Sequence, residues 1–244
     1  MKPKILLVNP PIYDFSAYDF WLKPYGMLRV AGYLRGQTDF MLFDFMDRLD
    51  PRVPARHYRS DSWGRGEFHS EAAAKPEVFA QIPRCFRRFG LSPQAFHEFM
   101  VDEGPFDFAF VQTGMTYWYL GVREVIEAIR RNSPGTKIIL GGVYATLCES
   151  HARIMGADLI ISGTDLNPLR HFLGVNLDAN EPPLWEGVST AADGNFETCR
   201  WLPVSLHLLL GSASVPAIPC TVSGWRAARI GVFSRMRRRA CRIL

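Results

Sequence analysis

The chain has 244 residues, 48% of them hydrophobic, and is long enough to bury one sizeable core. Its formal net charge of +4 arises from residues 200–244, which hold eight arginines and no lysine or acidic residue. The remainder has 20 basic and 24 acidic side chains, so this mildly acidic body excludes nucleic acid as an expected partner. The five cysteines lack zinc or redox spacing and no secretory signal precedes them, so we expect reduced thiols and a cytoplasmic protein.

Short apolar runs alternate with segments of helical spacing along residues 4–161. The runs predict strands at 4–8, 39–45, 107–111, 137–140 and 157–161. Helices are predicted at about 24–34, 92–100 and 122–131, and from the glycine pair at 141–142 to about 155. This alternation predicts an α/β fold with a doubly wound parallel sheet.

Two segments depart from this alternation. The loop 12–23 is rich in aromatic residues, which indicates that it covers something flat. Residues 49–90 interleave prolines with arginines, and we expect an insertion with little regular structure. Within it, Gly64-Arg65-Gly66 follows no predicted strand, so an ordinary turn is favoured over a phosphate cradle.

The predicted strands all end in loop or glycine residues. In a doubly wound sheet, ligands bind outside the carboxyl ends of the strands. The clearest such end is the glycine pair after the strand that begins at Lys137, because glycine lets another molecule approach the backbone closely. We therefore expect a ligand site along this edge of the sheet.

Several of these motifs, taken in order, resemble a known family. They are Asn9-Pro10-Pro11, Pro24-Tyr25-Gly26, Gly141-Gly142-Val143-Tyr144-Ala145-Thr146 and Gly156-Ala157-Asp158 with Ser162-Gly163-Thr164-Asp165. Residues 3–170 resemble the amino-terminal cobalamin-binding domain of cobalamin-dependent radical S-adenosylmethionine (radical SAM) enzymes. The resemblance implies a flavodoxin-like, Rossmann-like sheet of five strands in the order 2-1-3-4-5. It also implies that the corrin lies over the strand ends, with its nucleotide tail passing the glycines into the sheet.

The resemblance implies cobalamin as the cofactor and assigns contact residues by position. These are Asn9, Pro10, Tyr25, Gly26, Thr113, Gly114, Gly141, Gly142, Val143, Tyr144 and Gly163, with Tyr117 and Trp118 expected to pack against the corrin. The family of mutases and methionine synthases has an Asp-x-His-x-x-Gly loop after strand one, which this chain lacks. We interpret His171 as a histidine on a helix surface, so no protein histidine is expected below the cobalt.

The chain also lacks the Cys-x-x-x-Cys-x-x-Cys motif that holds the iron-sulfur cluster in radical enzymes. The cluster and S-adenosylmethionine are therefore expected only in the full-length family, and this chain alone is not expected to be catalytic. We expect a cobalamin-binding domain at 1–175, a linker at 176–199 and an atypical arginine-rich tail at 200–244. Another chain would then supply the catalytic domain.

Three interpretations of the tail stay open: a shifted reading frame or artificial end, a membrane segment at 201–225, and a basic amphipathic helix that binds a partner. The first is favoured, because three prolines and a histidine argue against the membrane segment.

Two other functions also stay open. The same sheet could carry a flavin or nucleotide. Less favoured is an independent enzyme with Cys148 as nucleophile and His151 as base, because neither residue stands at a strand end.

Overall fold

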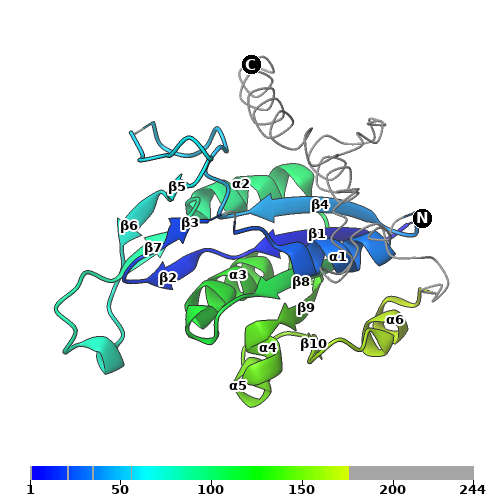
Figure 1. Cartoon of the computed structure of the whole chain (residues 1–244). Coiled ribbons are helices and arrows are strands. Elements are labelled where there is room, and N and C mark those ends of the chain that lie inside the picture. The colour runs from blue at the N-terminus through cyan, green and yellow to red at the C-terminus, as the bar shows by residue number, and fades with distance from the viewer. Residues whose placement is uncertain (1, 21, 35, 56, 176–244) are drawn as a thin grey trace, which may run out of the picture. The chain divides into compact units, whose positions relative to one another are not determined.

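A computed structural model describes residues 2–20, 22–34, 36–55 and 57–175. Met1–Leu177 form one compact unit (Figure 1). The expected linker and tail, with their candidate membrane segment, lie outside the described residues. Within the described ranges, the helices are too short or too polar to cross a membrane.

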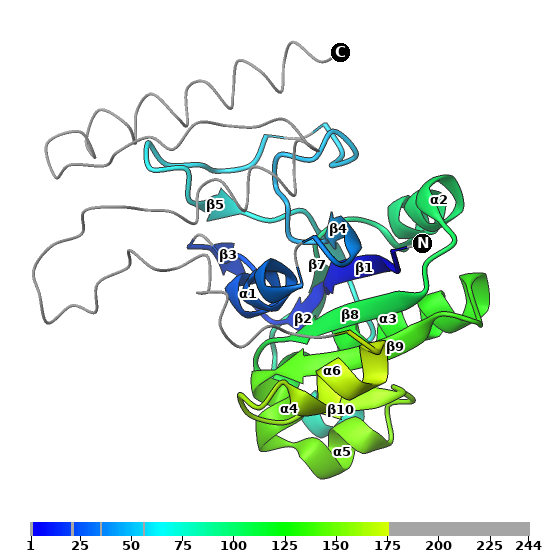
Figure 2. The same ribbon diagram turned by 90° about the vertical axis from the view of Figure 1, so that its right-hand side faces the viewer.

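The central sheet has five parallel strands in the order β10-β9-β8-β1-β4 (Figures 1 and 2). They are β1 (Lys4–Asn9), β4 (Asp39–Asp44), β8 (Phe108–Thr113), β9 (Lys137–Gly142) and β10 (Leu159–Ile161). Helices surround the sheet, so the predicted doubly wound α/β fold is confirmed. The order 2-1-3-4-5 is also confirmed, because β4 is the second of the five strands along the chain. All the carboxyl ends therefore meet at one edge.

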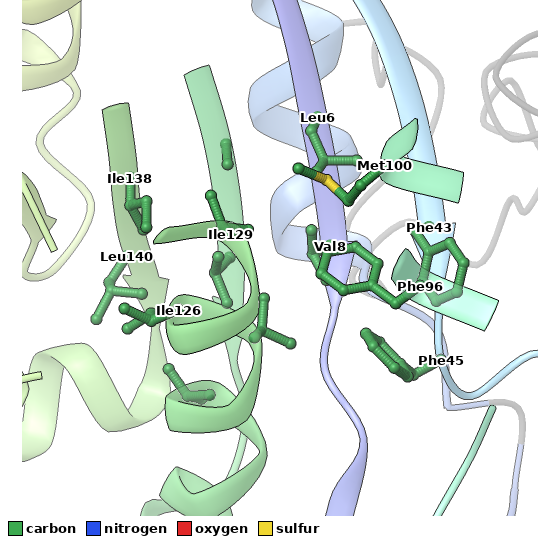
Figure 3. Packing of buried hydrophobic residues seen from close by; sticks show 14 of the residues in the cluster. Leu6, Val8, Phe43, Phe45, Phe96, Met100, Ile126, Ile129, Ile138 and Leu140 are labelled. Atoms are coloured by element: carbon green, nitrogen blue, oxygen red, sulfur yellow. The ribbon is translucent and has the colours of Figure 1, made fainter. Parts of the chain in front are cut away.

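The larger core lies on one face of the sheet, beneath α2 (Pro93–Glu103) and α3 (Tyr119–Asn132). Alternate residues of a strand point to opposite faces, and Leu6 and Val8 of β1 point to this one. Figure 3 shows Ile126 and Ile129 of α3 packed toward β9. With Val122 and Val125 they form an apolar stripe on α3, and all four side chains are buried.

The predicted start of α2 is confirmed, because the Ser92 hydroxyl accepts the backbone N–H of Ala95 at 3.2 Å. On the opposite face, α1 (Tyr25–Tyr33) contacts β8 and β9 and lies behind β1 in Figure 3. Gly36, with φ +84°, follows this helix, as the sequence indicates. The last described helix, α6 (Asn167–Leu173), carries His171 exposed on its surface, which confirms that interpretation.

The prediction of a single helix after the glycine pair is wrong in one respect. The chain instead forms two short helices, α4 (Val143–Leu147) and α5 (Glu149–Arg153). The break falls at Cys148, whose φ of −124° and ψ of 43° are not helical.

The insertion at 49–90 contains short regular elements. They are β5 (Gly66–Glu67), β6 (Ser70–Ala72), η1 (Glu77–Phe79) and β7 (Arg87–Phe89). The expected aromatic loop supplies β2 (Ile12–Asp14) and β3 (Tyr18–Asp19). An antiparallel sheet of order β2-β7-β6 and a β3-β5 pair result. Because β2 and β3 pair with strands far away in the sequence, no local alternation predicted these short strands.

The Gly64-Arg65-Gly66 stretch joins a turn to β5: Gly64 lies in a bend after the turn at 62–63, and Gly66 begins the strand. The Asp61 carboxylate accepts the backbone N–H of Arg65 at 3.0 Å. Gly64 offers its carbonyl to the Arg48 guanidinium at 2.9 Å. The polar groups of this turn therefore bond within the protein.

A buried ion pair joins the β2-β7-β6 sheet to α3. Arg88 of β7 is 6% exposed, and its Nη2 and Nε atoms donate to the Glu124 carboxylate at 2.6 and 2.9 Å. The Tyr13 hydroxyl of β2 donates to Glu124 Oε2 at 2.6 Å. Burial and the neighbouring Glu124 raise the pKa of Tyr13, so the phenol stays protonated.

Replacing Glu124 by glutamine leaves the Arg88 charge buried without a counter-charge. We expect Glu124→Gln to lower the free energy of unfolding by about 3 kcal/mol. Glu127→Gln is the matched control, because Glu127 lies one turn later on α3 in an exposed pair with Arg123. The control should cost less than about 1 kcal/mol. Urea unfolding followed by circular dichroism measures both, and equal losses would contradict the assigned role of the buried pair.

Asp158 fastens the short edge strand β10 to the rest of the sheet. Its Oδ2 atom accepts the Ile138 backbone N–H at 2.7 Å and the Arg130 guanidinium at 2.7 Å. Partial desolvation opposes ionisation of Asp158. The Ile138 N–H, Arg130 and Lys137 more than offset this effect and lower the pKa of the carboxyl.

This lowered pKa predicts how stability depends on pH. A carboxyl with a lower pKa in the folded state stabilises above its unfolded pKa, and this contribution disappears as pH falls through the folded value. We expect Asp158→Asn to lower the free energy of unfolding by about 2 kcal/mol at pH 7. The difference from wild type should shrink between about pH 5 and pH 2. Asp102→Asn, at an exposed position of α2, is the control, and a pH-independent difference for Asp158→Asn would contradict the prediction.

Candidate functional site

A row of residues crosses the sheet at its carboxyl edge. Asn9 of β1 pairs with Asp44 of β4, and Gln112 of β8 pairs with Gly141 of β9, which pairs with Ile161 of β10. Val8 pairs with Val111, so the next residues, Asn9 and Gln112, are also neighbours. Paired residues of parallel strands point to the same face. This row faces the side of the sheet that α1 covers, because Leu6 and Val8 point to the other side.

A charged cluster occupies the β1–β4 end of the row. The Asn9 amide donates to Asp44 Oδ1 at 2.7 Å, and the Lys23 ammonium lies 3.4 Å from Asp44 Oδ2. Burial raises the pKa of the Asp44 carboxyl, although Lys23 and Asn9 act in the opposite direction. Desolvation opposes the charge of Lys23, but the carboxylates of Asp44, Asp47 and Asp19 raise its pKa. Lys23 thereby ties the aromatic loop to the sheet.

The hydroxyl of Thr113 holds together the junction of β8, β9 and α4. It donates to the Gly141 carbonyl at 3.0 Å and accepts the Ala145 backbone N–H at 3.0 Å. Thr113 is 1% exposed. The predicted contact residue therefore uses its hydroxyl within the protein, and its role here is to position the glycine pair.

The backbone conformation and packing require glycine at only one position of the pair. Gly142 has φ +119°, and a Cβ there would lie 2.3 Å from the Thr113 carbonyl oxygen. Neither constraint applies to Gly141, whose φ lies outside the left-handed region. The nearest atom to a Cβ at Gly141 would be Ile161 Cβ at 3.8 Å, an ordinary contact. The structure thus explains Gly142 by the backbone, whereas a side chain at Gly141 would be tolerated.

An aromatic wall stands after β8, on the 3-10 turn η2 (Thr116–Trp118). The Trp118 indole packs on Gly114, where a Cβ would lie 3.0 Å from Trp118 Cε3. Its Nε1–H donates to Asp14 Oδ2 at 2.9 Å. Tyr117 contacts Trp118 edge-on at 5.8 Å between ring centroids and is 49% exposed. Of the two expected packing residues, Trp118 is fixed by the protein and Tyr117 faces outward.

Tyr144 points into the protein and is 1% exposed. Its hydroxyl and His151 Nδ1 are 2.6 Å apart, and the Tyr119 ring lies against His151 at 5.0 Å. Burial, with smaller effects of Cys148 and Tyr119, raises the pKa of Tyr144 to about 12. The hydrogen-bond partner of His151 is thus a tyrosine, and among the described residues no hydrogen bond joins His151 to Cys148.

The other predicted residues divide between the edge and its surroundings. Pro10 is buried, and the next residue, Pro11, packs so closely on α3 that a Cβ at Gly121 would lie 1.8 Å from its carbonyl oxygen. Tyr25 and Gly26 begin α1, and a Cβ at Gly26 would meet nothing within 4 Å. Gly163 follows β10 with φ +83° and donates its N–H to Thr146 Oγ1 at 3.0 Å.

Exposed apolar side chains gather in the segments that follow the strands. Most of the large apolar side chains that the described residues expose belong to this set. They are Phe20 and Leu22 after β3, Tyr25 at the start of α1, Met115 and Tyr117 after β8, and Val143 and Leu147 in α4.

Sequence reasoning missed three side chains of this edge as site residues: Lys23, Asp44 and Gln112. Asp44 had a detectable signal, because an aspartate ends the second predicted strand. Gln112 had none, because its significance depends on a missing hydrogen bond. Its Oε1 atom is buried and has no hydrogen-bond partner within the part of the chain that the structure describes.

The described residues contain no cluster of three or more His, Cys, Asp or Glu side chains that could hold a metal ion. No family model matches the chain, and comparison with curated proteins gives no match either.

The contrast between the two glycines predicts different effects of alanine. We expect Gly142→Ala to lower the free energy of unfolding by about 2–3 kcal/mol, because the new methyl group meets the Thr113 carbonyl in a strained backbone conformation. Gly141→Ala should change it by less than about 1 kcal/mol. Thermal unfolding of the two variants provides the comparison, and similar losses for both would show that this distinction is wrong.

Proposed function

We propose that the carboxyl edge of the central sheet binds cobalamin. The observation that carries this proposal is the set of exposed apolar side chains in the segments that follow β3, β8 and β9. Exposed apolar side chains that gather on one part of a protein are typical of binding surfaces. A corrin is a broad ring with apolar faces, which such side chains would cover.

The residues of the edge fit a corrin with an appended nucleotide in two respects. Tyr117, Val143 and Tyr25 provide exposed apolar area from separate segments, so a ring could be held across them. Gly141 has no side chain at the carboxyl end of β9, although neither packing nor conformation requires glycine there. The nucleotide appendage would approach the backbone at this position, between Gln112 and Ile161.

Bound cobalamin would supply methyl transfer or assist radical chemistry in a complete enzyme. The residues of this chain would bind the ring, orient it through the glycine junction that Thr113 holds, and exclude water with the aromatic wall. The iron-sulfur cluster and S-adenosylmethionine would belong to a catalytic domain supplied by another chain. In that arrangement the chain described here would act as a carrier of cobalamin.

Incubation of the purified protein with hydroxocobalamin, followed by gel filtration, tests the proposal. We expect the corrin absorption spectrum to elute with the protein. Elution without it would contradict the proposal, and a yellow protein as purified would favour a flavin on the same edge.

A charge placed among the exposed apolar side chains after β9 should weaken cobalamin binding without unfolding the protein. We expect Val143→Asp to raise the Kd for cobalamin at least about tenfold, because an aspartate would lose hydration beneath the ring. Val143 is 51% exposed at the first turn of α4, where an aspartate is compatible with the helix. Val101→Asp is the matched control, because Val101 is 65% exposed on α2, away from the edge. Equal effects of the two changes would argue against this surface as the site.

A further inference from the structure

Two short segments beyond the carboxyl ends of β1 and β4 form a flap, which we define as residues 18–20 and 60–67. The segments contain β3 and β5, which pair with each other, and Figure 1 shows both strands past the ends of β1 and β4. No apolar side chain within these two ranges is buried. A single pair of short strands is marginally stable by itself, so other contacts must hold the flap in place.

The guanidinium group of Arg48 provides those contacts. Its Nε atom donates to the Glu67 carbonyl at 2.8 Å, and its Nη1 atom donates to the Gly64 carbonyl at 2.9 Å. Its Nη2 atom donates to the Ser60 hydroxyl, and Nη1 lies 3.6 Å from Asp19 Oδ2. Arg48 belongs to the segment that follows β4, so a side chain from outside the flap holds both of its segments.

The sequence of β5 makes room for this guanidinium. A Cβ at Gly66 would lie 1.9 Å from Arg48 Nη2 and 2.4 Å from the Arg59 carbonyl oxygen. A side chain at this position would therefore displace the guanidinium or the neighbouring backbone. The Arg48 side chain is 9% exposed, and the Asp19 carboxylate balances its charge. Glycine at position 66 is thus explained by the space that Arg48 occupies.

The chain next to the flap is fixed to the rest of the protein. Phe68, directly after the second segment, is buried in an apolar cluster, and Ala17, directly before the first, packs against that cluster. The Tyr58 hydroxyl, near the start of the second segment, and His69 Nδ1 are 2.8 Å apart. Apolar contacts therefore anchor the base, whereas polar contacts hold the flap itself. Because polar groups can exchange such contacts for water at small net cost, the flap can open while its base stays in place.

The flap presents aromatic side chains to solvent. Phe20 is 62% exposed, Trp63 is 56% exposed and Tyr18 is 37% exposed. The rings of Tyr18 and Phe20 lie 5.0 Å apart between centroids, and the Arg65 guanidinium lies 5.9 Å from the centroid of the Phe20 ring. Aromatic side chains contribute binding free energy when their area is removed from water. Closure on a ligand would give this flap the buried apolar area that it lacks by itself.

We propose that the flap opens to admit a ligand to the carboxyl edge and closes on it with these aromatic side chains, and that Arg48 is the latch that holds the flap closed. The identity of the ligand rests on the proposed function, whereas the latch is a property of the ligand-free protein. Arg48 is a positioning residue, because it acts through the placement of Phe20 and does not contact the ligand. Release of the flap then governs how fast cobalamin enters and leaves.

Hydrogen exchange of the ligand-free protein, measured by mass spectrometry, tests the latch. We expect Arg48→Met to speed exchange of the amides at 60–67 at least about tenfold and to leave those of β1 and β8 unchanged, because only local contacts are lost. Gly66→Ala should act in the same way by displacing the guanidinium. Arg52→Met is the matched control, because Arg52 forms an exposed ion pair with Asp50. Exchange rates that equal those of wild type, or that rise throughout the sheet, would overturn the latch.

The rate at which cobalamin dissociates tests closure on a ligand. We expect Arg48→Met and Phe20→Ala each to raise this rate at least about tenfold, the first because the flap opens more often and the second because the closed flap loses an aromatic contact. Phe20→Ala should leave hydrogen exchange of the ligand-free flap unchanged, which separates the contact from the latch. An unchanged dissociation rate in either variant would overturn closure. Failure of the wild-type protein to bind cobalamin would overturn the proposed function and closure on that ligand, whereas the exchange rates decide the latch by themselves.

Discussion

The candidate site depends on the hydroxyl group of Thr113. By donating to Gly141 and accepting from Ala145, this group fixes the end of β8 to the start of α4. The approach is so close that position 142 must be glycine. Gly141 and Gln112 are paired residues in the row across the sheet. The Thr113 hydroxyl thus positions the glycine pair, and exposed apolar side chains lie in the segments that follow the strands.

The sheet could be predicted because its information is local. Each strand is a short apolar run, and β8, β9 and β10 lead into glycines at positions 114, 141 and 163. The β2-β7-β6 sheet could not be predicted in the same way, because β2 and β7 are joined only by contacts between distant segments. Arg88 illustrates the difficulty: within an arginine-rich stretch it suggests a solvated charge, yet it is buried against Glu124.

The sequence indicates which edge of the sheet holds the candidate site, but not how its residues are arranged. The glycine pair and the aromatic residues indicated the edge, whereas the sequence gives no reason to separate Gly141 from Gly142. Only the distances to Thr113 and Ile161 distinguish them. The expected contacts Thr113 and Tyr144 are instead occupied by bonds within the protein. Gln112 could not be recognised from sequence, because an absent hydrogen bond is a property of the folded arrangement alone.

The ion pair between Arg88 and Glu124 has a consequence for local opening of the structure. Glu124 lies within α3, whose apolar stripe is part of the main core, so the antiparallel sheet is coupled to that core through a charge. Separating the sheet from α3 would expose two desolvated charges without partners. We therefore expect the amides of β7 and α3 to exchange hydrogen as one cooperative unit, at a rate slower than so short a strand would show by itself.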